Sequence, residues 1–324
     1  MYRIALIIPY FGNLPKYSEL FFESLKHNDN LDVFILTDQN VNYELNNLHV
    51  INTDFECVQK RIRSTFGFKV NIDRPYKLCD YRPAYAIIFA DLIKGYDFWG
   101  YCDLDLVFGD TKRFLTDKIL SAYDKIYQHG HLSLFRNSPE INNEFMADFG
   151  MNYRDVYSTP VNCVFDEIPG IQQKFDHDIL KTYKKWDFYD VNPWKYHMTR
   201  VVSHVPDSVL NDDFDFNTEC FYWDKGHLFR AALKDEKIIT NEYIYLHFQK
   251  RDYDVSKHVP GQPYFLSNEG CEPMISRELC EMDLDKYNKR SLMKELQYTY
   301  RQNKNTWDKR VEKYIKYANY KKVK

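Results

Sequence analysis

The residues of this chain best suited to chemistry are two aspartates, Asp103 and Asp105, which stand one residue apart. They follow a mostly aromatic and apolar run over residues 96–102. Aspartate is avoided inside strands, and its burial is costly without a partner. A pair of aspartates at the end of such a strand therefore predicts a cation or a polar ligand at that point.

The Asp-x-Asp spacing is not specific on its own, because the chain contains four further copies. They begin at Asp176, Asp213, Asp252 and Asp283. Only Asp103 and Asp105 end an aromatic and apolar run, so we interpret the other copies as solvated turns or helix ends. Carboxylate oxygens are ligands for Mg²⁺ or Mn²⁺, and a diphosphate can complete the coordination. The sequence thus predicts a site where a metal ion neutralises charge on a departing nucleoside diphosphate.

The composition is that of a globular chain, with 324 residues, 44% hydrophobic content and a net charge of -3. Its length allows one large domain or two modest ones. No nucleic-acid partner is expected, because proteins that follow phosphate backbones normally carry a strong basic excess. Seven cysteines without a Cys-x-x-Cys pair predict reduced thiols. No segment has the length and apolarity of a membrane span or signal peptide, so we expect a cytoplasmic protein.

Strand and helix signals alternate through the first 110 residues and predict an α/β fold with a mainly parallel central sheet. Later strand signals, with a hairpin turn at residues 224–226, predict a mixed C-terminal half. The expected strands cover residues 2–8, 33–37, 48–51, 97–101, 131–135, 161–165, 219–223, 227–231 and 243–248. Helices are expected over residues 16–27, after Asp54 as N-cap, and from Pro83 to Leu92.

Ligands of open α/β sheets bind beyond the carboxyl ends of the strands. Pro9, Tyr10 and Phe11 follow the first expected strand, and Asp38 follows the second. The exit of a further strand carries Asp103. We therefore expect these residues to surround one nucleotide.

Two cations, Lys77 and Arg82, lie just before the helix that leads to the aspartate strand, with Asp80 between them. The N-terminus of that helix also favours an anion. Lys77 and Arg82 are candidate contacts of a nucleotide donor, and Asp80 is a candidate for holding one of them in place. Salt bridges at the surface are the alternative interpretation.

His247 ends the strand-like residues 243–248, and Lys250 and Arg251 follow it. Histidine can ligate Mn²⁺, while Lys250 or Arg251 can contact phosphate oxygens. A half-buried histidine next to a solvated basic turn is the alternative.

Asp166 and Glu167 end another expected strand and are candidates for the general base that an acceptor hydroxyl would need. A turn or a helix cap is the alternative. The sequence contains no G-x-S-x-G elbow, P-loop or G-x-G-x-x-G fingerprint. Serine hydrolases, P-loop NTPases and ordinary dinucleotide enzymes are therefore disfavoured.

Residues 301–324 carry nine Lys or Arg against Asp308 and Glu312. Apolar and aromatic residues recur among them at helical spacing, namely Trp307, Val311, Tyr314, Ile315 and Ala318. This pattern predicts a basic amphipathic helix. Two interpretations stay open: packing of the aromatic stripe on the domain, or attachment to an anionic membrane surface at the inner face of the cell membrane.

Several motifs together resemble a family of bacterial polysaccharide-locus proteins. They are Ile-Pro-Tyr-Phe-Gly at residues 8–12, Thr-Asp at 37–38, Arg-Pro-Tyr-Lys-Leu-Cys-Asp-Tyr-Arg-Pro-Ala-Tyr at 74–85 and Trp-Gly-Tyr-Cys-Asp-Leu-Asp-Leu-Val-Phe-Gly-Asp at 99–110. The resemblance runs from residue 2 to about residue 250 and includes residues 130–137 and 165–167. That family is similar to nucleotide-sugar glycosyltransferases with the A-type (GT-A) fold and a DxD motif.

The resemblance implies a GT-A-like nucleotide-diphospho-sugar transferase fold with C-terminal helices. It places Asp103 near the ribose and the metal, makes Asp105 a direct metal ligand, and gives His247 and Lys250 the later metal and diphosphate contacts. We expect a catalytic domain over residues 1–285, with a nucleotide-binding half at 1–110 and an acceptor half at 111–285. Residues 286–324 would then form a basic helical tail.

The expected function is a metal-dependent glycosyltransferase that uses Mn²⁺ or Mg²⁺ and a nucleotide-diphosphate sugar, with a UDP-sugar as donor. Its acceptor would be a surface glycan of the capsule, O-antigen or lipooligosaccharide type. Two alternatives stay open. One is a metal-dependent phosphodiesterase or nuclease, and the other is a carbohydrate-binding protein that kept the scaffold without turnover.

Overall fold

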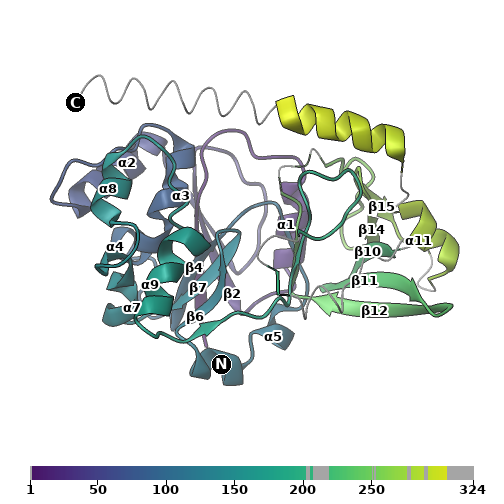
Figure 1. The fold of residues 1–324 in the computed structure, drawn as a ribbon, viewed down its shortest axis with the longest axis horizontal. Helices are drawn as coiled ribbons and strands as arrows, with labels where there is room; N and C mark the ends of the chain where they lie inside the picture. The colour runs from purple at the N-terminus through teal and green to yellow at the C-terminus, as the bar shows by residue number, and fades with distance from the viewer. Residues whose placement is uncertain are drawn as a thin grey trace.

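The structure is a computed structural model that describes residues 2–201, 205–206, 219–249, 251, 253–275, 279–287 and 291–304. Within this part of the chain the fold is a mixed α/β arrangement with one large sheet and two smaller ones (Figure 1). No helix among the described residues is long and apolar enough to cross a membrane.

The large sheet has seven strands in the order β3-β2-β1-β4-β7-β6-β8. Neighbours among β1 to β4 pair in parallel, β7 runs antiparallel to β4 and β6, and β8 is parallel to β6. The bounds are β1 Ile4–Pro9, β2 Leu31–Thr37, β3 Leu48–Asn52, β4 Phe98–Cys102, β6 Lys125–His129, β7 Leu132–Arg136 and β8 Thr182–Tyr183. The predicted α/β class and the mainly parallel first half are confirmed.

The central strands of this sheet are buried on both faces, as their near-continuous apolar sequences require. In β1, Ile4, Leu6 and Ile8 join a core that includes Phe21 of α1 (Ser18–Leu25). The residues between them, Ala5 and Ile7, join a second core on the opposite face, with α2 (Phe55–Thr65). The sheet therefore separates two hydrophobic layers, and α1 and α2 cover opposite faces (Figure 1).

The predicted N-cap of α2 is confirmed, because the Asp54 carboxylate accepts a hydrogen bond from the Cys57 N–H at 2.7 Å. The expected helix from Pro83 to Leu92 is shorter: after α4 the Leu92 N–H bonds the Phe89 carbonyl in a turn. The other helices and helical turns are η1 Pro75–Lys77, α3 Leu78–Tyr81, η2 Arg82–Ala84, α4 Tyr85–Ile88, α5 Thr111–Phe114, α6 Asp117–Ala122, α7 Pro139–Asn143, η3 Glu144–Met146, α8 Tyr153–Ser158, η4 Ile168–Gln172 and α9 Gln173–His177.

Two smaller sheets follow in the C-terminal half. The antiparallel sheet runs β12-β11-β10-β14-β15, and the three-stranded sheet runs β5-β13-β9. Lys225 and Gly226 both have positive φ between β10 and β11, as a two-residue hairpin turn requires, so the predicted hairpin is confirmed. The bounds are β5 Leu106–Phe108, β9 Tyr189–Asp190, β10 Glu219–Asp224, β11 His227–Lys234, β12 Lys237–Tyr243, β13 Tyr245–His247, β14 Tyr264–Leu266 and β15 Cys271–Pro273.

The single strand expected at residues 243–248 is instead split, because β12 ends at Tyr243 and β13 starts at Tyr245 in a different sheet. Two helices complete the described chain, α11 (Glu281–Tyr287) against β10 and β11, and a helix over residues 292–304. The predicted tail at residues 301–324 lies largely outside the described residues, which end at residue 304.

The strand predicted at residues 161–165 is wrong. This segment is irregular, and Val164 has a φ of 60°. The backbone N–H groups of Cys163 and Phe165 donate to the Asp80 carboxylate at 2.9 to 3.1 Å. A side chain thus satisfies the donors that a neighbouring strand would otherwise have taken.

Candidate functional site

Asp103 and Asp105 occupy the loop that leaves the fully buried strand β4. The Asp103 N–H donates to the His131 carbonyl at 3.0 Å, and the Phe248 N–H donates to the Asp105 carbonyl at 3.0 Å. The large sheet therefore holds one end of this loop, and the chain just beyond β13 holds the other. The loop lies at the carboxyl end of a central parallel strand, where open α/β sheets bind ligands.

The three-stranded sheet brings two further side chains to this loop. In the pairing of β5 with β13, His247 lies opposite Leu106, the residue that follows Asp105. On the other side of β13, His247 lies opposite Asp190 of β9. Three segments far apart in the sequence thus place His247 between the side chains of Asp105 and Asp190.

Asp103, Asp105 and His247 form a group that could hold a metal ion. One ligand atom from each lies within 4.8 Å of the others. The His247 Nε2 is 3.3 Å from an Asp105 oxygen and 3.9 Å from an Asp103 oxygen. An octahedral Mg²⁺ holds its ligands at about 2.1 Å, which places adjacent ligands about 3 Å apart. The spacing and the donor set, two carboxylates and one imidazole, therefore fit a divalent metal ion.

Asp190 orients the imidazole of His247. Its carboxylate lies 2.8 Å from the His247 Nδ1 and also accepts from the Gln249 amide at 2.5 Å. Burial lowers the pKa of His247, but Asp105 and Asp190 together raise it well above its usual value. A carboxylate on the second ring nitrogen fixes the orientation in which Nε2 faces the two aspartates, as is common for metal-binding histidines.

Arg82 contacts the Asp103 carboxylate through the oxygen that does not face His247. Its guanidinium donates to the Asp103 carboxylate, to Asp166 at 2.9 Å and to the Gly130 carbonyl at 2.9 Å. Burial raises the pKa of Asp103, an effect that Arg82 opposes and Asp105 reinforces. The same arginine also opposes the effect of burial on Asp166, whose pKa is raised to about 7. Arg82 therefore ties the aspartate loop to the wall that carries Asp166.

These groups line a single cavity of about 1010 Å³. Its lining includes most of the predicted site residues, namely Pro9, Tyr10, Phe11, Arg82, Asp103, Asp105, Asp166, Glu167 and His247. Asp38 is not part of the lining, and its carboxylate instead accepts from the Gly12 N–H at 3.3 Å. Asp38 thus contacts the loop that follows β1 rather than the cavity itself.

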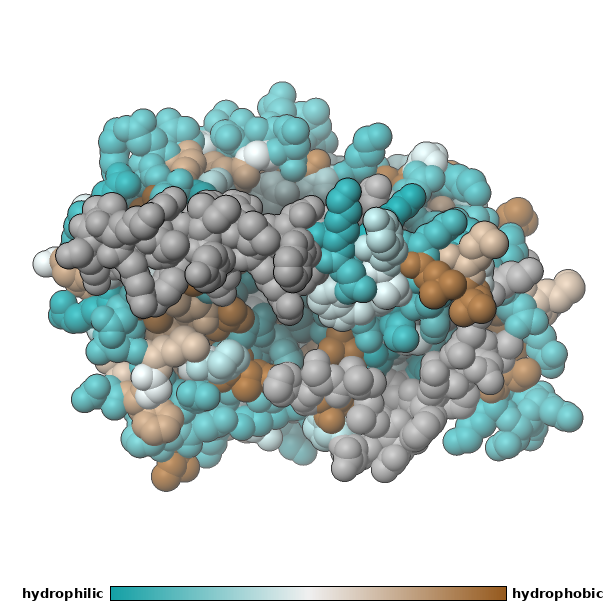
Figure 2. Space-filling view, turned by 45° about the horizontal axis from the view of Figure 1, so that its top comes forward, coloured by the Kyte–Doolittle hydropathy of each residue, from teal (hydrophilic) through white to brown (hydrophobic). Residues whose placement is uncertain are grey.

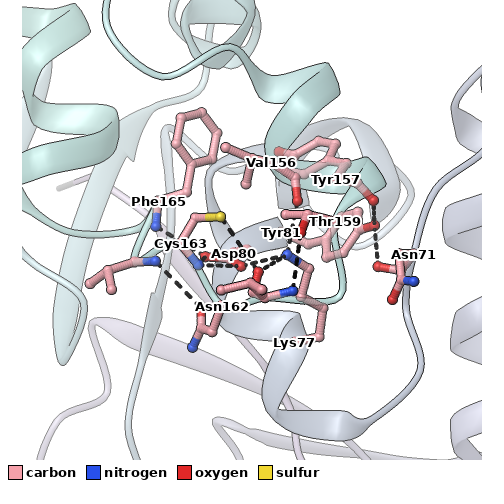
Figure 3. A network of polar contacts seen from close by, with 12 residues as sticks. Asn71, Lys77, Asp80, Tyr81, Val156, Tyr157, Thr159, Asn162, Cys163 and Phe165 are labelled. Atoms are coloured by element: carbon pink, nitrogen blue, oxygen red, sulfur yellow. Dashed lines mark hydrogen bonds and ion pairs between the residues drawn. The ribbon is translucent and has the colours of Figure 1, made fainter. Parts of the chain in front are cut away.

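Lys77 and Asp80 form a closed pair in the wall behind the cavity (Figure 3). Both side chains are 0% exposed, and the Lys77 ammonium donates to Asp80, the Val156 carbonyl and the Val161 carbonyl at 2.7 to 2.8 Å. An ammonium has three donors, and all three are used here. This corrects the expectation that Lys77 faces a donor, because neither side chain reaches the cavity in this structure.

Of the two cations that follow His247, the structure describes only Arg251. Lys250 lies outside the described residues. Arg251 is buried, and its guanidinium donates to the carbonyls of Tyr196 and Lys195 at 2.8 and 2.6 Å. Arg251 therefore holds the neighbouring segment and does not offer its charge to a phosphate.

The two base candidates differ in their surroundings. The Asp166 side chain is 5% exposed and paired with Arg82, whereas the Glu167 side chain is 31% exposed and lies 3.8 Å from the His129 Nδ1. Burial raises the pKa of Glu167, but His129, the Gly130 N–H and Arg82 together outweigh it and lower that pKa. Glu167 is thus the ionised and more accessible carboxylate of the two.

One protein-family model matches most of the chain. The model of a family of unknown function (DUF6625) matches residues 6–273. The chain belongs to this family. No curated protein matches the chain. Among solved structures, the apo crystal structure of mouse xyloside xylosyltransferase 1 aligns at 10% identity and a TM-score of 0.37, covering 77% of this chain and 98% of the mouse chain. We draw neither fold nor function from a likeness of this size.

The residue at the site that sequence reasoning missed most clearly is Asp190. It stands in a two-residue strand, and its partner His247 lies 57 residues later in the chain. The local signal was weak, since a single aspartate near aromatic residues is common. Only the pairing of β9 with β13 gives Asp190 a role.

His131 was also missed. Its Nδ1 shares a 2.9 Å hydrogen bond with the Tyr245 hydroxyl, and its Nε2 is buried without a hydrogen-bond partner among the described residues. His131, Asp190 and His247 form a second group with ligand atoms within 4.8 Å. Asp190 is already bonded to His247 and Gln249 in that group, so the group with Asp103 and Asp105 is the better metal candidate.

Proposed function

We propose that this chain is a metal-dependent glycosyltransferase that takes a sugar from a nucleotide-diphosphate sugar. The observation that carries the proposal is the meeting of Asp103, Asp105 and His247 at one wall of the cavity. A volume of about 1010 Å³ is that of a small-molecule site and can admit a nucleotide sugar. A UDP-sugar is the expected donor, and Mn²⁺ or Mg²⁺ the expected ion.

Asp103, Asp105 and His247 would hold the ion, and Asp190 would keep His247 oriented toward it. When bound, the ion neutralises charge on the diphosphate leaving group. Pro9, Tyr10 and Phe11 line the same cavity from the end of β1 and would border the nucleotide.

Arg82 positions the acidic wall of the site. Its contacts with Asp103 and Asp166 fix the distance between the metal loop and the segment that carries the base candidates. Five carboxylates line the cavity, from Asp103, Asp105, Asp166, Glu167 and Asp190, so Arg82 also offsets part of their mutual repulsion. Without this guanidinium, the pKa values of Asp103 and Asp166 would rise further, and a protonated carboxyl group binds a cation less well.

Glu167 is the favoured base for the acceptor hydroxyl. Its lowered pKa keeps it ionised at neutral pH, and its side chain lines the cavity and is more exposed than that of Asp166. Asp166 is held by Arg82, so it is better suited to positioning that arginine than to accepting a proton. The acceptor that we propose is a surface glycan, and the reaction would take place on the cytoplasmic side.

The test is a panel of nucleotide sugars with Mn²⁺, read by the shift in thermal unfolding and then by release of the nucleoside diphosphate. We expect stabilisation by at least one donor and its turnover with a glycan acceptor. The Asp105→Asn substitution, or EDTA added to the unaltered chain, should abolish both the stabilisation and the turnover. Asp285→Asn is a matched control, because Asp285 is the exposed second aspartate of the Asp-x-Asp copy in α11.

Two outcomes of this test favour the other interpretations. Cleavage of a phosphodiester by the same Asp105-dependent site, with no sugar transfer, would identify a phosphodiesterase or nuclease. Glycan binding without affinity for any nucleotide sugar in Mn²⁺ would identify a carbohydrate-binding protein.

A further inference from the structure

The helix over residues 292–304 turns its apolar side chains outward. Leu292, Met293, Leu296 and Tyr300 are 64% to 78% exposed. At about 100° per residue, these four positions fall within an arc of about 100° on one side of the helix. A surface helix of a globular domain normally buries such an arc. This helix is therefore amphipathic with its apolar face unpartnered among the described residues.

The inner face of the helix is held by polar contacts instead. The Glu295 carboxylate accepts from the Tyr196 N–H at 2.9 Å and pairs with the His197 Nδ1 at 2.9 Å. One turn further along, the Tyr298 ring lies under the Arg251 guanidinium at 5.4 Å. These contacts fix the orientation of the helix, so the outward position of its apolar face follows from its attachment.

Figure 2, in which the top of Figure 1 comes forward, shows apolar side chains at the surface of this side of the molecule beside hydrophilic ones. Single exposed apolar residues are ordinary, whereas a contiguous group with a polar border marks a contact surface for a protein or a membrane. The neighbouring charges distinguish the two. The described helix carries Arg301 and Lys304, and residues 301–324 hold nine Lys or Arg against two acidic residues.

In the sequence after residue 304, Trp307, Val311, Tyr314 and Ala318 recur at spacings of three and four residues, as the apolar residues of the described helix do. Basic residues beside an apolar arc with an aromatic residue are the features of helices that lie in the interface of anionic membranes. We propose that the outward face of helix 292–304, with Leu292, Met293, Leu296 and Tyr300, docks on an anionic lipid surface.

This proposal goes beyond glycosyl transfer and does not depend on it. The two features are nevertheless physically linked. Asn192, Pro193 and Trp194 line the cavity, and Tyr196 and His197, two and three residues further on, hold Glu295 of the helix. Docking of the helix would therefore bring one rim of the cavity close to the lipid surface.

The experiment measures sedimentation of the full chain with vesicles of phosphatidylcholine alone and of phosphatidylcholine with about 30% phosphatidylserine. We expect binding to the anionic vesicles, and binding reduced by at least about tenfold on neutral vesicles. The double variant Met293→Glu with Leu296→Glu should lose at least about tenfold in affinity for the anionic vesicles. A second double variant, Leu292→Glu with Tyr300→Glu, should do the same.

The control is Ile179→Glu, which places a single glutamate at an apolar residue that is 88% exposed outside this helix. It should bind like the unaltered chain. All substituted side chains are exposed, so the midpoint of thermal unfolding of each variant should stay within about 4 °C of that of the unaltered chain. The same measurement would reveal a variant that is misfolded or aggregated.

Three results would overturn the proposal. One is that the full chain binds neither vesicle. Another is equal binding by the unaltered chain and both helix variants, which would assign any lipid affinity to residues beyond 304. The third is a concentration-dependent dimer, seen by light scattering, that the helix variants dissociate, which would make a second copy of the chain the occupant.

Discussion

Two cations five residues apart, Lys77 and Arg82, each pair with aspartate but serve different parts of the molecule. Lys77 and Asp80 are fully buried, and every donor of the ammonium is satisfied by the protein. Arg82 lines the cavity and pairs with Asp103 and Asp166, whose loops also face that cavity. The two pairs have the same chemistry, and what separates them is access to a ligand.

The comparison teaches that a charge close to a predicted site does not by itself indicate binding. A closed pair holds the backbone around it: Asp80 receives the N–H groups of Cys163 and Phe165 and so fixes the segment that leads to Asp166. An open pair holds charged groups that a ligand can still reach. The closed pair should therefore control stability, and the open pair should control the pH dependence and affinity of the site.

The largest effect should come from Lys77→Met. Removal of one partner from a buried ion pair leaves an uncompensated charge, and the free energy of unfolding should fall by about 3–5 kcal/mol. Denaturant unfolding under reducing conditions measures this loss. If the variant unfolds at the same denaturant concentration as the unaltered chain, the distinction between a closed and an open pair is lost.

Arg82→Met tests the open pair, as Lys77→Met tests the closed one. With the guanidinium gone, Asp103 and Asp166 lose their shared partner, and Mn²⁺-dependent binding of the donor should weaken by about 100-fold. Arg82→Lys should restore only part of it, since an ammonium cannot bridge both carboxylates in the same plane. Calorimetric titration with a nucleoside diphosphate and Mn²⁺ is the measurement, and unchanged affinity in Arg82→Met would remove Arg82 from the site.

Asp190→Asn should have a smaller effect on the same binding. Outer partners of metal-binding histidines typically contribute a factor of about 10 to 100 in metal affinity. His247 would keep its place in β13, so the fold should be preserved and the loss confined to the metal. Titration with Mn²⁺ followed by electron paramagnetic resonance measures this directly, and an affinity equal to that of the unaltered chain would contradict the orienting role.

A third buried cation sharpens the comparison, because Lys125 has only neutral partners. Its ammonium donates to the Tyr127 carbonyl at 2.9 Å and to the Gln172 amide oxygen at 2.8 Å. Burial is the main cause that lowers the pKa of Lys125 to about 7, while Glu167 and Asp176 oppose the shift. A closed site without a counter-charge should therefore favour the neutral amine.

The sign of the resulting pH dependence follows from linkage. Between pH 7 and the ordinary lysine pKa the unfolded chain binds more protons at this position, so stability rises with pH. From pH 7.0 to 8.5 the contribution of Lys125 should be about 1.5 kcal/mol. Denaturant unfolding at the two pH values should show this increase for the unaltered chain and its absence in Lys125→Met. An identical pH response in both proteins would contradict the shift.

The sequence allowed the parallel half of the fold to be predicted because β1 and β4 are buried on both faces and read as continuous apolar runs. It also pointed to Asp103, Asp105 and His247, since each follows or ends an apolar strand. Asp190 could not be found in this way, because its role depends on the pairing of a two-residue strand with β13.

The misplacement of Lys77 has a related physical cause. Nothing near residue 77 in the sequence indicates that the segment at 156–165 folds over it and supplies two carbonyl acceptors. The same packing of distant segments explains why residues 161–165 are not a strand, because the N–H groups of Cys163 and Phe165 donate to Asp80. Local patterns predict elements, whereas these assignments depended on contacts between residues about 80 positions apart.

The central claim is that Asp103, Asp105 and His247 hold one divalent cation in the cavity. Its most direct test is a calorimetric titration with Mn²⁺ in the presence of UDP, for the unaltered chain, Asp105→Asn and Asp285→Asn. We predict one ion per chain, an affinity at least about 100-fold weaker in Asp105→Asn, and no change in Asp285→Asn. Equal affinities in all three proteins, or no Mn²⁺ bound by the unaltered chain, would contradict the claim.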